Sequence, residues 1–330
     1  MANISPVTNL DFFATKTALK TFLKNQDRFA DYDFEGSNMN VLLDVLSYNT
    51  FYNNYYYNMA ISEMFLDSAQ ERNSIISHAK ELNYLPRSRR SSMATVTLNI
   101  TATQDSNYFT IPANTALTGK CGNVTFTFLT DKTNTAITTD ASSNATPRIF
   151  TIAGMQAFQG RLMSETLSVS DSILSNSWID TRSLYVTVNG VEYVQKSDIF
   201  GISATQKVFY LQPEEDGKYS LQFGQNTFGA QPETADVIVA TYRICNGADA
   251  DGVKSFTIAQ NLGGASSIST NVTVPSTGGF LSETIESIRT FAPKALQVQD
   301  RAVTKSDYEV LLRNRFPNIQ AISVYGGDEV

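Results

Sequence analysis

The chain has 330 residues, a net charge of −7 and 17% charged residues, a composition typical of a globular protein with two or three domains. Its acidic balance argues against duplex nucleic acid as the main ligand, because neutralising phosphates requires a basic surface. The two cysteines, Cys121 and Cys245, cannot build a disulfide framework, and the sequence contains neither a recognisable signal peptide nor an apolar run long enough to cross a membrane.

The front of the chain predicts helices. Residues 10–25 form a short amphipathic candidate, and Ser37 can cap a long helix from Asn38 to about Leu66. The apolar residues of this long helix fall on two faces, whereas an ordinary surface helix has one, so we expect packing on both sides, as in a bundle. The first face holds Met39, Leu42, Leu43, Leu46 and Thr50, and the second holds Val41, Val45, Tyr48, Tyr52, Tyr55 or Tyr56, and Met59.

Five tyrosines and Phe51 lie in the stretch from Tyr48 to Tyr57. One interpretation is a bundle core whose hydroxyl groups reach the edge. Another is a surface that binds a second copy or a partner, since tyrosine combines rigid apolar area with a polar tip. The two are compatible for different faces, whereas a base-stacking platform is disfavoured because no arginine is near. The residues expected to contact a second copy of the chain or a partner protein are Tyr48, Tyr52, Tyr55, Tyr56 and Met59.

A third helix is predicted after a capping-box pattern at Ser68–Glu71, with Pro86 closing it. The only histidine, His78, falls on this helix and is expected to be a surface residue, because no second histidine or nearby cysteine accompanies it. The basic run Arg87–Ser92 then predicts a solvated linker, with phosphate binding as the less favoured interpretation. The apolar side of the helix holds Ile75, Ile76, Ala79 and Leu82.

The middle of the chain predicts strands that pair mostly antiparallel. Val96, Leu98 and Ile100 alternate with polar residues, which gives one buried and one solvated face. Asn189-Gly190 suits the two left-handed positions of a type I′ turn, so a hairpin is predicted around it. Thr130–Thr146 has little periodicity and predicts an exposed excursion. Further strands are predicted at Tyr108–Ala116, Val124–Leu129, Val208–Leu211, Tyr219–Phe223, Val237–Tyr242 and Thr270–Val274.

No catalytic, cofactor or metal site is predicted. The acidic cluster Glu214–Gly217 is interpreted as a solvated turn, since neighbouring acids seldom flank one substrate from opposite sides. Asn246–Gly252 hints at a calcium loop, but alignment with the EF-hand pattern leaves two oxygen ligands missing, so an Asx-rich turn is the better interpretation. The common hydrolase, zinc-protease, phosphate-loop and dinucleotide motifs are missing. We therefore expect a protein that is not an enzyme.

Two helices and a strand are predicted near the end of the chain. Ser282 is a candidate N-cap, and Pro293 is expected to end that helix at Ala292. Thr304 and Asp307 form a capping-box-like pair that opens the second helix. This second helix has Tyr308, Leu311 and Leu312 on one side, ends at Pro317 and is followed by a strand with Ile322 and Val324.

The C-terminal run carries matching positions at Arg289, Ala292-Pro293, Ala295-Leu296, Gln299, Arg301–Thr304 and Asp307–Glu309. The sheet region adds Tyr219–Phe223, Gly224, Phe228, Gly229, Pro232 and Val237–Tyr242. Together they resemble the signature of the phage baseplate J-like family, which are wedge proteins of contractile tails. Phe291, Asp300 and Ala235-Asp236 depart from the family pattern. The resemblance implies that Arg289, Pro293, Arg301, Thr304, Asp307 and Tyr308 shape the terminal module.

A narrower resemblance covers about the first 90 residues. Its residues are Asp31–Ser37, Asn40–Leu42, Asp44, Leu46, Tyr48–Thr50 and Asn83–Pro86. They are similar to the N-terminal helical region of the large baseplate wedge subunits of T-even-type phages. In that family such helices join partner-chain helices in a bundle that ties each wedge together.

The predicted fold class is α+β, with a helical bundle region over residues 1–90, a mainly antiparallel β module over residues 91–276 and a C-terminal α+β module over residues 277–330. The resemblance implies a structural virion protein that dimerises, forms the ring around the tail hub, links wedges and transmits the trigger for sheath contraction. Implied partners are further copies, a helical bundle partner and a sheath-proximal wedge protein. The implied location is the tail baseplate of the virion, after assembly in the host cytoplasm.

No cofactor, nucleic acid or membrane insertion is expected. The alternative function is a glycan-binding tail or adhesin module, in which exposed tyrosines and sheet loops bind sugar. A hydrolase is the third choice, because the only histidine has no histidine partner.

Overall fold

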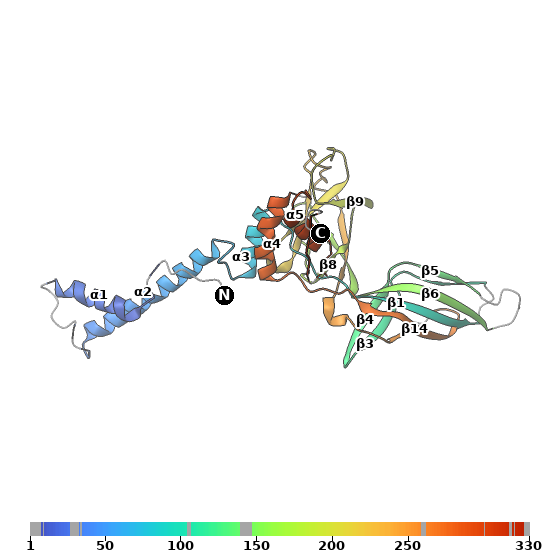
Figure 1. Ribbon diagram of the computed structural model, residues 1–330, viewed down its shortest axis with the longest axis horizontal. Helices are drawn as coiled ribbons and strands as arrows, with labels where there is room; N and C mark the ends of the chain where they lie inside the picture. The colour runs from blue at the N-terminus through green and yellow to red at the C-terminus, as the bar shows by residue number, and fades with distance from the viewer. Residues whose placement is uncertain are drawn as a thin grey trace. The chain divides into compact units, whose positions relative to one another are not determined.

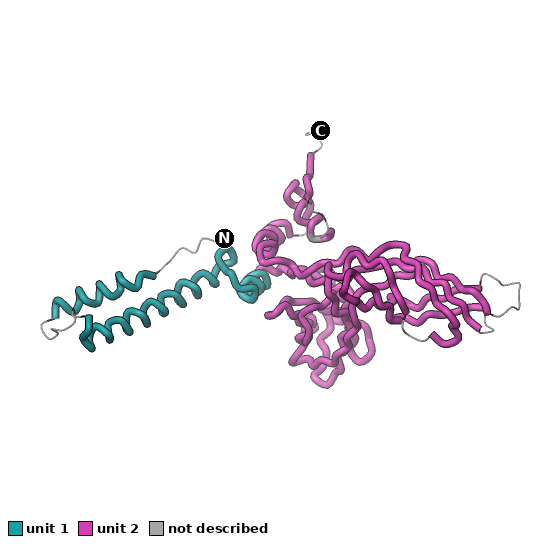
Figure 2. The backbone as a smooth tube through the Cα atoms, turned by 90° about the horizontal axis from the view of Figure 1, so that it is seen from below, with its two compact units in different colours: residues 1–81 teal, residues 82–330 magenta. Residues whose placement is uncertain are grey.

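The computed structural model describes residues 8, 10–26, 33, 35–103, 107–138, 147–258, 262–299, 301–316, 319 and 321–326. The chain divides into two compact units, residues 1–81 and residues 82–330 (Figure 2). The first is helical and the second is built mainly on antiparallel sheets, so the predicted α+β class is confirmed. The subdivision at residues 90 and 276 stays a prediction. The predictions that involve Asp31, Tyr32, Phe34, Asp300 and Pro317 lie outside the described residues.

The first unit contains the helices α1 (Phe12–Lys24), α2 (Asn38–Glu63) and α3 (Arg72–Glu81). Helix α1 runs alongside α2 (Figure 1), and Nζ of Lys16 lies 2.5 Å from a carboxylate oxygen of Asp44 between the two helices. Ser37 caps α2 as predicted, because its hydroxyl accepts a hydrogen bond from the N–H of Asn40. The long helix is thus confirmed, although it ends at Glu63.

The capping box predicted at Ser68–Glu71 is not formed. The Ser68 hydroxyl instead donates to the carbonyl of Ser62 at 2.6 Å. The carboxylate of Glu63, at the end of α2, accepts hydrogen bonds from the N–H groups of Gln70 at 2.8 Å and Glu71 at 3.3 Å. A charged acceptor makes stronger hydrogen bonds than a hydroxyl, so the side chain from the preceding helix takes the donors that the local serine was expected to satisfy.

One six-stranded sheet of the second unit has the order β13-β3-β4-β6-β1-β14, and β2 pairs with β5 beside it (Figure 1). The alternation predicted at Val96, Leu98 and Ile100 is confirmed, since all three side chains are fully buried in the core of this sheet. Part of the excursion predicted at Thr130–Thr146 is the strand β5. The strands are β1 (Met93–Ala102), β2 (Tyr108–Ile111), β3 (Ala116–Cys121), β4 (Val124–Thr130), β5 (Asn134–Ile137), β6 (Arg148–Gln159), β13 (Phe256–Thr257) and β14 (Ala265–Thr277).

The other six-stranded sheet has the order β11-β10-β9-β8-β12-β7 and its own core, which includes the fully buried Tyr242. The predicted hairpin is confirmed, because Asn189 has φ 50° and Gly190 has φ 77° between two antiparallel strands. One pairing is parallel, β9 with β10. The strands are β7 (Arg161–Leu167), β8 (Ile179–Val188), β9 (Val191–Lys196), β10 (Val208–Pro213), β11 (Tyr219–Phe223) and β12 (Ile238–Ile244).

Helix α4 (Ile285–Val298) corrects two predictions. Its N-cap is Thr284, whose hydroxyl accepts from the N–H of Ser287, so Ser282 is not the cap. The helix also continues through Pro293 to Val298. A proline inside a helix removes one backbone hydrogen bond, but this helix has a face of buried side chains that favours its continuation. That face holds Ile288, Ala292 and Val298.

Helix α5 (Lys305–Arg315) begins as predicted. Thr304 and Asp307 form a complete capping box, in which each side chain accepts a hydrogen bond from the other's backbone N–H. The expected apolar side is wrong, because among the described side chains of α5 Val310 is buried, at 3% exposure, while Tyr308 is 45% exposed. The strand predicted at Ile322 and Val324 is also absent, since residues 321–326 are described without regular structure.

Candidate assembly interface

One side of α2 carries a stripe of large apolar side chains that this chain leaves exposed. The exposed fraction is 56% for Val41 and 59% for Val45, and 39% even for Tyr52, the least exposed tyrosine of the helix. We call this set the α2 stripe, and its members are Val41, Val45, Tyr48, Tyr52, Tyr55, Tyr56 and Met59. The second apolar face predicted for this helix is therefore a surface and not part of the chain's own core.

The spacing within the α2 stripe is that of a helix seam. Residues 41, 45, 48, 52, 55 and 59 are separated alternately by four and three positions. Apolar residues at this alternating spacing form the contact line between two helices in a coiled coil, where they interlock with the partner's side chains. Tyr56 flanks the line. The pattern indicates that a second helix can lie along α2.

The other side of α2 is held in place by contacts within the first unit. Leu43, Ser47 and Asn58 are buried. The side chain of Asn58 accepts a hydrogen bond from the N–H of Thr8 at 3.0 Å and donates one to the carbonyl of Thr8 at 3.2 Å. Together with α1, this pair of hydrogen bonds holds the side of α2 that faces away from the stripe.

The aromatic side chains of the stripe support one another. The Tyr48 hydroxyl donates to the Tyr52 hydroxyl at 2.8 Å, and the two ring centroids are 4.5 Å apart in an edge-on arrangement. The hydrogen bond from Tyr48, followed by the electrostatic effect of Tyr48, raises the pKa of Tyr52. Tyr56 continues the row, with its ring 6.4 Å from that of Tyr52. Such ordered aromatic rings lose little conformational entropy when a partner covers them.

The terminal signature residues that the resemblance singled out lie along α4 and α5. Arg289 pairs with Glu286 one turn earlier, with 2.6 Å between nitrogen and oxygen, and Arg301 donates to the side chain of Gln299 at 3.1 Å. These contacts and the Thr304–Asp307 box are local to the two helices. A role in shaping a module for Arg289, Pro293, Arg301, Thr304, Asp307 and Tyr308 stays a prediction.

The signature residues of the sheet region form a tight turn after β11. The carbonyl of Gly224 accepts hydrogen bonds from the N–H groups of Thr227 and Phe228, both at 2.9 Å. A Cβ on Gly224 would lie 2.0 Å from the carbonyl oxygen of Phe228. Gly229 has φ 122°, and a Cβ there would lie 2.5 Å from Val208. Both glycines are therefore required by the backbone path, whereas Phe228 is 45% exposed and Pro232 lies farther along the same loop.

The loop Asn246–Gly252, which resembles a calcium loop in sequence, forms hydrogen bonds to distant segments of the chain. The amide of Gln159 exchanges two hydrogen bonds with Asn246, one with its side chain and one with its N–H, each at 2.8 Å. Asp251 accepts from the hydroxyl of Ser92 at 2.6 Å and from the N–H of Gly279 at 3.1 Å. Within the described ranges, no group of three or more histidine, cysteine, aspartate or glutamate side chains is placed to hold a metal. Among the helices described, none has the length and hydropathy needed to cross a membrane.

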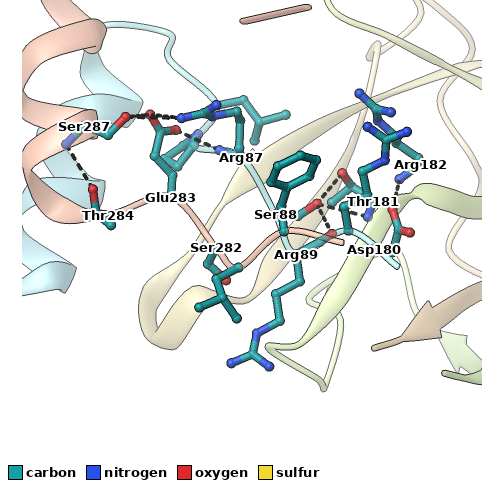
Figure 3. Close-up of a pocket in the computed structure, with 15 residues that line it drawn as sticks. Arg87, Ser88, Arg89, Asp180, Thr181, Arg182, Ser282, Glu283, Thr284 and Ser287 are labelled. Atoms are coloured by element: carbon teal, nitrogen blue, oxygen red, sulfur yellow. Dashed lines mark hydrogen bonds and ion pairs between the residues drawn. The ribbon is translucent and has the colours of Figure 1, made fainter. Parts of the chain in front are cut away.

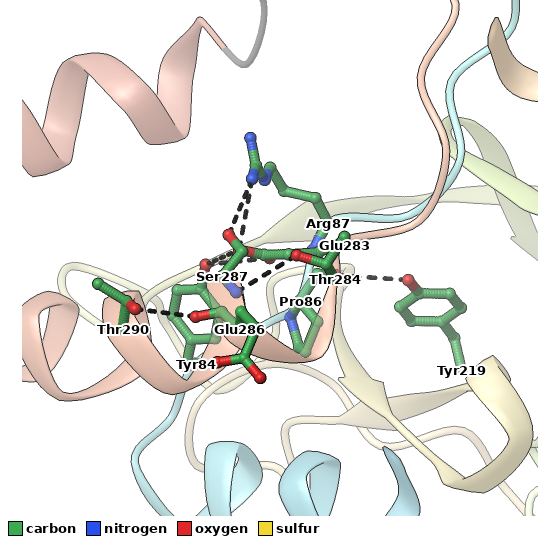
Figure 4. Close-up of polar contacts among 9 residues, drawn as sticks. All are labelled: Tyr84, Pro86, Arg87, Tyr219, Glu283, Thr284, Glu286, Ser287 and Thr290. Carbon is green, nitrogen blue, oxygen red and sulfur yellow. Dashed lines mark hydrogen bonds and ion pairs between the residues drawn. The ribbon is translucent and has the colours of Figure 1, made fainter. Parts of the chain in front are cut away.

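Sequence reasoning missed a buried carboxylate at Glu283, which is 4% exposed. Figure 4 shows that it accepts hydrogen bonds from the hydroxyls of Tyr84 and Ser287 and from the N–H of Arg87, the last at 3.0 Å. The guanidinium of Arg87 lies 3.4 Å away. No local pattern marks this residue, because its partners other than Ser287 come from a segment about 200 positions earlier, as the separation of 196 for Arg87 shows.

Comparisons with known proteins bear on the first unit most directly. Residues 11–84, which include the whole α2 stripe, match the family model of the helical domain of gp6-like baseplate wedge proteins. A curated relative, the baseplate wedge protein gp6 of Enterobacteria phage T4, is 28% identical over 345 aligned positions that cover 95% of this chain. They cover 51% of the relative, so the chain spans about half the length of that protein. These matched proteins are structural and not enzymes.

A solved structure is similar at a much lower level. A chain from the six-fold symmetrised cryo-EM structure of the anti-feeding prophage baseplate has 13% identity and a TM-score of 0.33, over 92% of this chain and 64% of that chain. The residues that carry the J-like resemblance lie beyond the matched helical domain, which ends at residue 84. That resemblance therefore stays a prediction.

Proposed function

We propose that this chain is a structural subunit of a phage baseplate wedge, and that the α2 stripe is the surface through which it joins another helix. The observation that carries the proposal is the exposed apolar seam on α2, within the residues that match the baseplate wedge family model. A soluble helix that exposes large side chains at coiled-coil spacing favours association, because covering those side chains removes apolar area from water.

The partner helix would come from a second copy or from another wedge subunit. Either arrangement would give the helical bundle that ties a wedge together. Dimers of this kind, joined to their neighbours, would form a closed ring around the tail hub, in which rotational symmetry fixes the surfaces that meet. A trigger could then change the ring only by favouring one set of contacts over another, which is how linking wedges and transmitting the contraction signal would operate.

The remaining parts of the proposal follow from this role. The chain would act in the virion, at the tail baseplate, after assembly in the host cytoplasm, and a sheath-proximal wedge protein would be among its partners. Its chemistry would be that of stable interfaces, without nucleic acid or membrane insertion. The 28% identity to the T4 wedge protein over nearly the whole chain supports this assignment.

Analytical ultracentrifugation of the chain, alone and with candidate wedge subunits, tests the proposal. Changing Tyr52 and Tyr56 together to alanine should weaken the association about tenfold or more, because aromatic anchors carry most of the energy of such contacts. Tyr57→Ala is the matched control, since Tyr57 is 62% exposed and Tyr56 is 61% exposed, but Tyr57 does not belong to the α2 stripe. It should leave the association unchanged.

Two results would overturn the assignment. Equal losses of association in the Tyr52→Ala plus Tyr56→Ala variant and in Tyr57→Ala would mean that the α2 stripe has no special role. A chain that stays monomeric with every wedge subunit, and that binds sugars on a glycan array, would favour the glycan-binding tail module instead. Circular dichroism of each variant shows whether α2 remains helical.

A further inference from the structure

A cavity of about 380 Å³ lies in the second unit, apart from the α2 stripe. Three segments line it: residues 85–90, which precede β1, residues 180–182 at the start of β8, and residues 280–287 around the beginning of α4 (Figure 3). Its volume is within the range of about 300–1,000 Å³ that is usual for ligand pockets. The basic run predicted as a solvated linker is thus one wall of a pocket.

The lining of this cavity is cationic in an acidic protein. The charged residues of the lining are Arg87, Arg89, Arg90 and Arg182 together with Asp180 and Glu283, so its formal charge is 4 − 2 = +2. The whole chain carries −7. A local excess of positive charge in a concave site raises the concentration of anions there.

Both carboxylates of the lining are already occupied by other donors. Asp180, at 5% exposure, accepts from the N–H groups of Ser91 at 2.9 Å and Arg182 at 3.2 Å. Glu283 accepts from Tyr84, Ser287 and the backbone of Arg87, as described above, and its carboxylate lies 3.4 Å from the guanidinium of Arg87. Asp180 also attracts the guanidinium of Arg90, but the effect of burial on the pKa of Arg90 is larger.

Arg89 and Arg90 each have an aromatic neighbour. The guanidinium of Arg89 lies 4.4 Å from the ring centroid of Trp178, and that of Arg90 lies 5.8 Å from the centroid of Phe280. Stacking on a ring face leaves the N–H groups in the guanidinium plane available to an acceptor. Burial, followed by repulsion from Arg182, lowers the pKa of Arg90, which places two like charges near one another.

Two further donors of the lining are unused. The Nε atoms of Arg87 and Arg89 are buried and have no hydrogen-bond partner among the described residues. A buried N–H group without a partner costs free energy comparable to a lost hydrogen bond. Both arginines belong to the cavity lining, so part of its guanidinium hydrogen-bonding capacity is not used within the chain.

We propose that this pocket binds a side-chain carboxylate on an acidic peptide segment of a partner protein. A carboxylate fits because its two oxygens match the paired N–H groups of a guanidinium. A single negative charge is favoured over a phosphate dianion, because Asp180 and Glu283 remain in the lining. Leu85, Pro86 and Leu281 supply apolar wall for the neighbouring parts of the peptide. The site does not depend on the role of the α2 stripe, since it lies entirely within residues 82–330.

The chain offers its own reporter for the test. Trp178 is the single tryptophan, and Arg89 stacks on it, so a ligand in the pocket should change its fluorescence. An acetylated, amidated tetraglutamate peptide titrated into the full chain at low salt should bind saturably. Calorimetry gives the same affinity by an independent readout. Rising salt should weaken binding, because the charges are partly solvated.

Arg182→Gln should weaken peptide binding about tenfold, the loss expected for one hydrogen bond to a charged group. Arg182→Lys should give a smaller loss, since it keeps the charge and removes the planar fork. Arg161→Gln is the matched control: it makes the same charge change on β7, where Arg161 is exposed and outside the cavity lining. It should leave the affinity unchanged.

Three outcomes would overturn the proposal. Absence of saturable binding at low salt would exclude an anion site. Equal losses in Arg182→Gln and Arg161→Gln would show attraction to the chain's overall charge and no pocket. If inorganic phosphate bound more tightly than the peptide, and Arg182→Gln weakened the binding of phosphate, the pocket would be a phosphate site.

Discussion

The hydroxyl of Tyr84 lies 3.0 Å from one carboxylate oxygen of Glu283 and 3.1 Å from the other, although 199 residues separate the two along the chain. The contact joins the segment that enters the second unit to the residue before the cap of α4. Because Glu283 is 4% exposed, its charge depends on hydrogen bonds where water would otherwise solvate it. The pair therefore holds two distant segments in one arrangement, and the same arrangement shapes a wall of the arginine-lined pocket (Figure 4).

Removing this hydroxyl should destabilise the second unit. Tyr84→Phe leaves a buried carboxylate with one donor fewer, and we expect the free energy of unfolding to fall by about 1–3 kcal/mol. Urea denaturation followed by Trp178 fluorescence measures the change. Tyr185→Phe serves as control, since Tyr185 is 48% exposed and removal of its hydroxyl should leave the midpoint in place. Equal midpoints for the two variants would contradict the assigned role of Glu283.

The same tyrosine predicts a loss of stability in alkali. Burial, the charge of Glu283 and the hydrogen bond to it raise the pKa of Tyr84 above its ordinary value. A folded-state pKa above the unfolded one means that this contribution to stability is complete below the unfolded value of about 10 and is lost as the pH rises beyond it. The advantage of the wild type over Tyr84→Phe should therefore shrink between about pH 9 and pH 11. A stability difference between the wild type and Tyr84→Phe that grows over this pH range would contradict the prediction.

Local signals in the sequence predicted the starts and turns well. Ser37, the Thr304–Asp307 pair and Asn189-Gly190 each act within three positions, so the sequence alone contains the whole interaction. The apolar spacing of α2 is likewise contained in one continuous segment, so it is visible in the sequence. The identity of what covers its exposed side is a property of another chain and cannot be read from this one.

Features that depend on distant segments were not predictable. Strand β6 was missed because Gly154, with φ 69°, interrupts its alternation between apolar and polar residues. Helix α4 passes through Pro293 because tertiary packing of Ile288 and Ala292 outweighs the local preference. The pocket is formed by three segments that are distant in the sequence. Without β8 and the start of α4 beside it, the segment from Arg87 to Arg90 has only the pattern of a solvated basic run.

Acidic pH should destabilise the junction between α2 and α3. Burial raises the pKa of Glu63, but hydrogen bonds from Gln70, Ser74 and Glu71 and the charge of His78 outweigh it, so the net pKa is lowered. A lowered folded-state pKa means that the contribution is present above the unfolded value of about 4.3 and is lost as the pH falls through the folded one.

Hydrogen exchange checks this prediction at the donors themselves. Protection of the Gln70 and Glu71 amides should fall in the wild type on acidification below about pH 4. In Glu63→Gln, protection should be lower at neutral pH and nearly independent of acid, because the amide does not titrate in this range. Glu81→Gln, an exposed change at the end of α3, should behave as the wild type. Acid-independent protection in the wild type would mean that Glu63 does not cap this junction.

The turn after β11 provides a test of backbone geometry that involves no charge. A Cβ on Gly224 would lie 2.0 Å from the carbonyl oxygen and 2.2 Å from the carbonyl carbon of Phe228, so alanine there must move the backbone of the turn. We expect Gly224→Ala to lower the free energy of unfolding by about 1–3 kcal/mol, the usual cost of forcing extra volume into a packed site. The matched control is Gly263→Ala, where a Cβ meets nothing within 4 Å. That change should be neutral or slightly stabilising, because alanine restricts the unfolded chain. Urea midpoints from Trp178 fluorescence compare the two variants, and a neutral Gly224→Ala would mean that the turn has room the structure does not show.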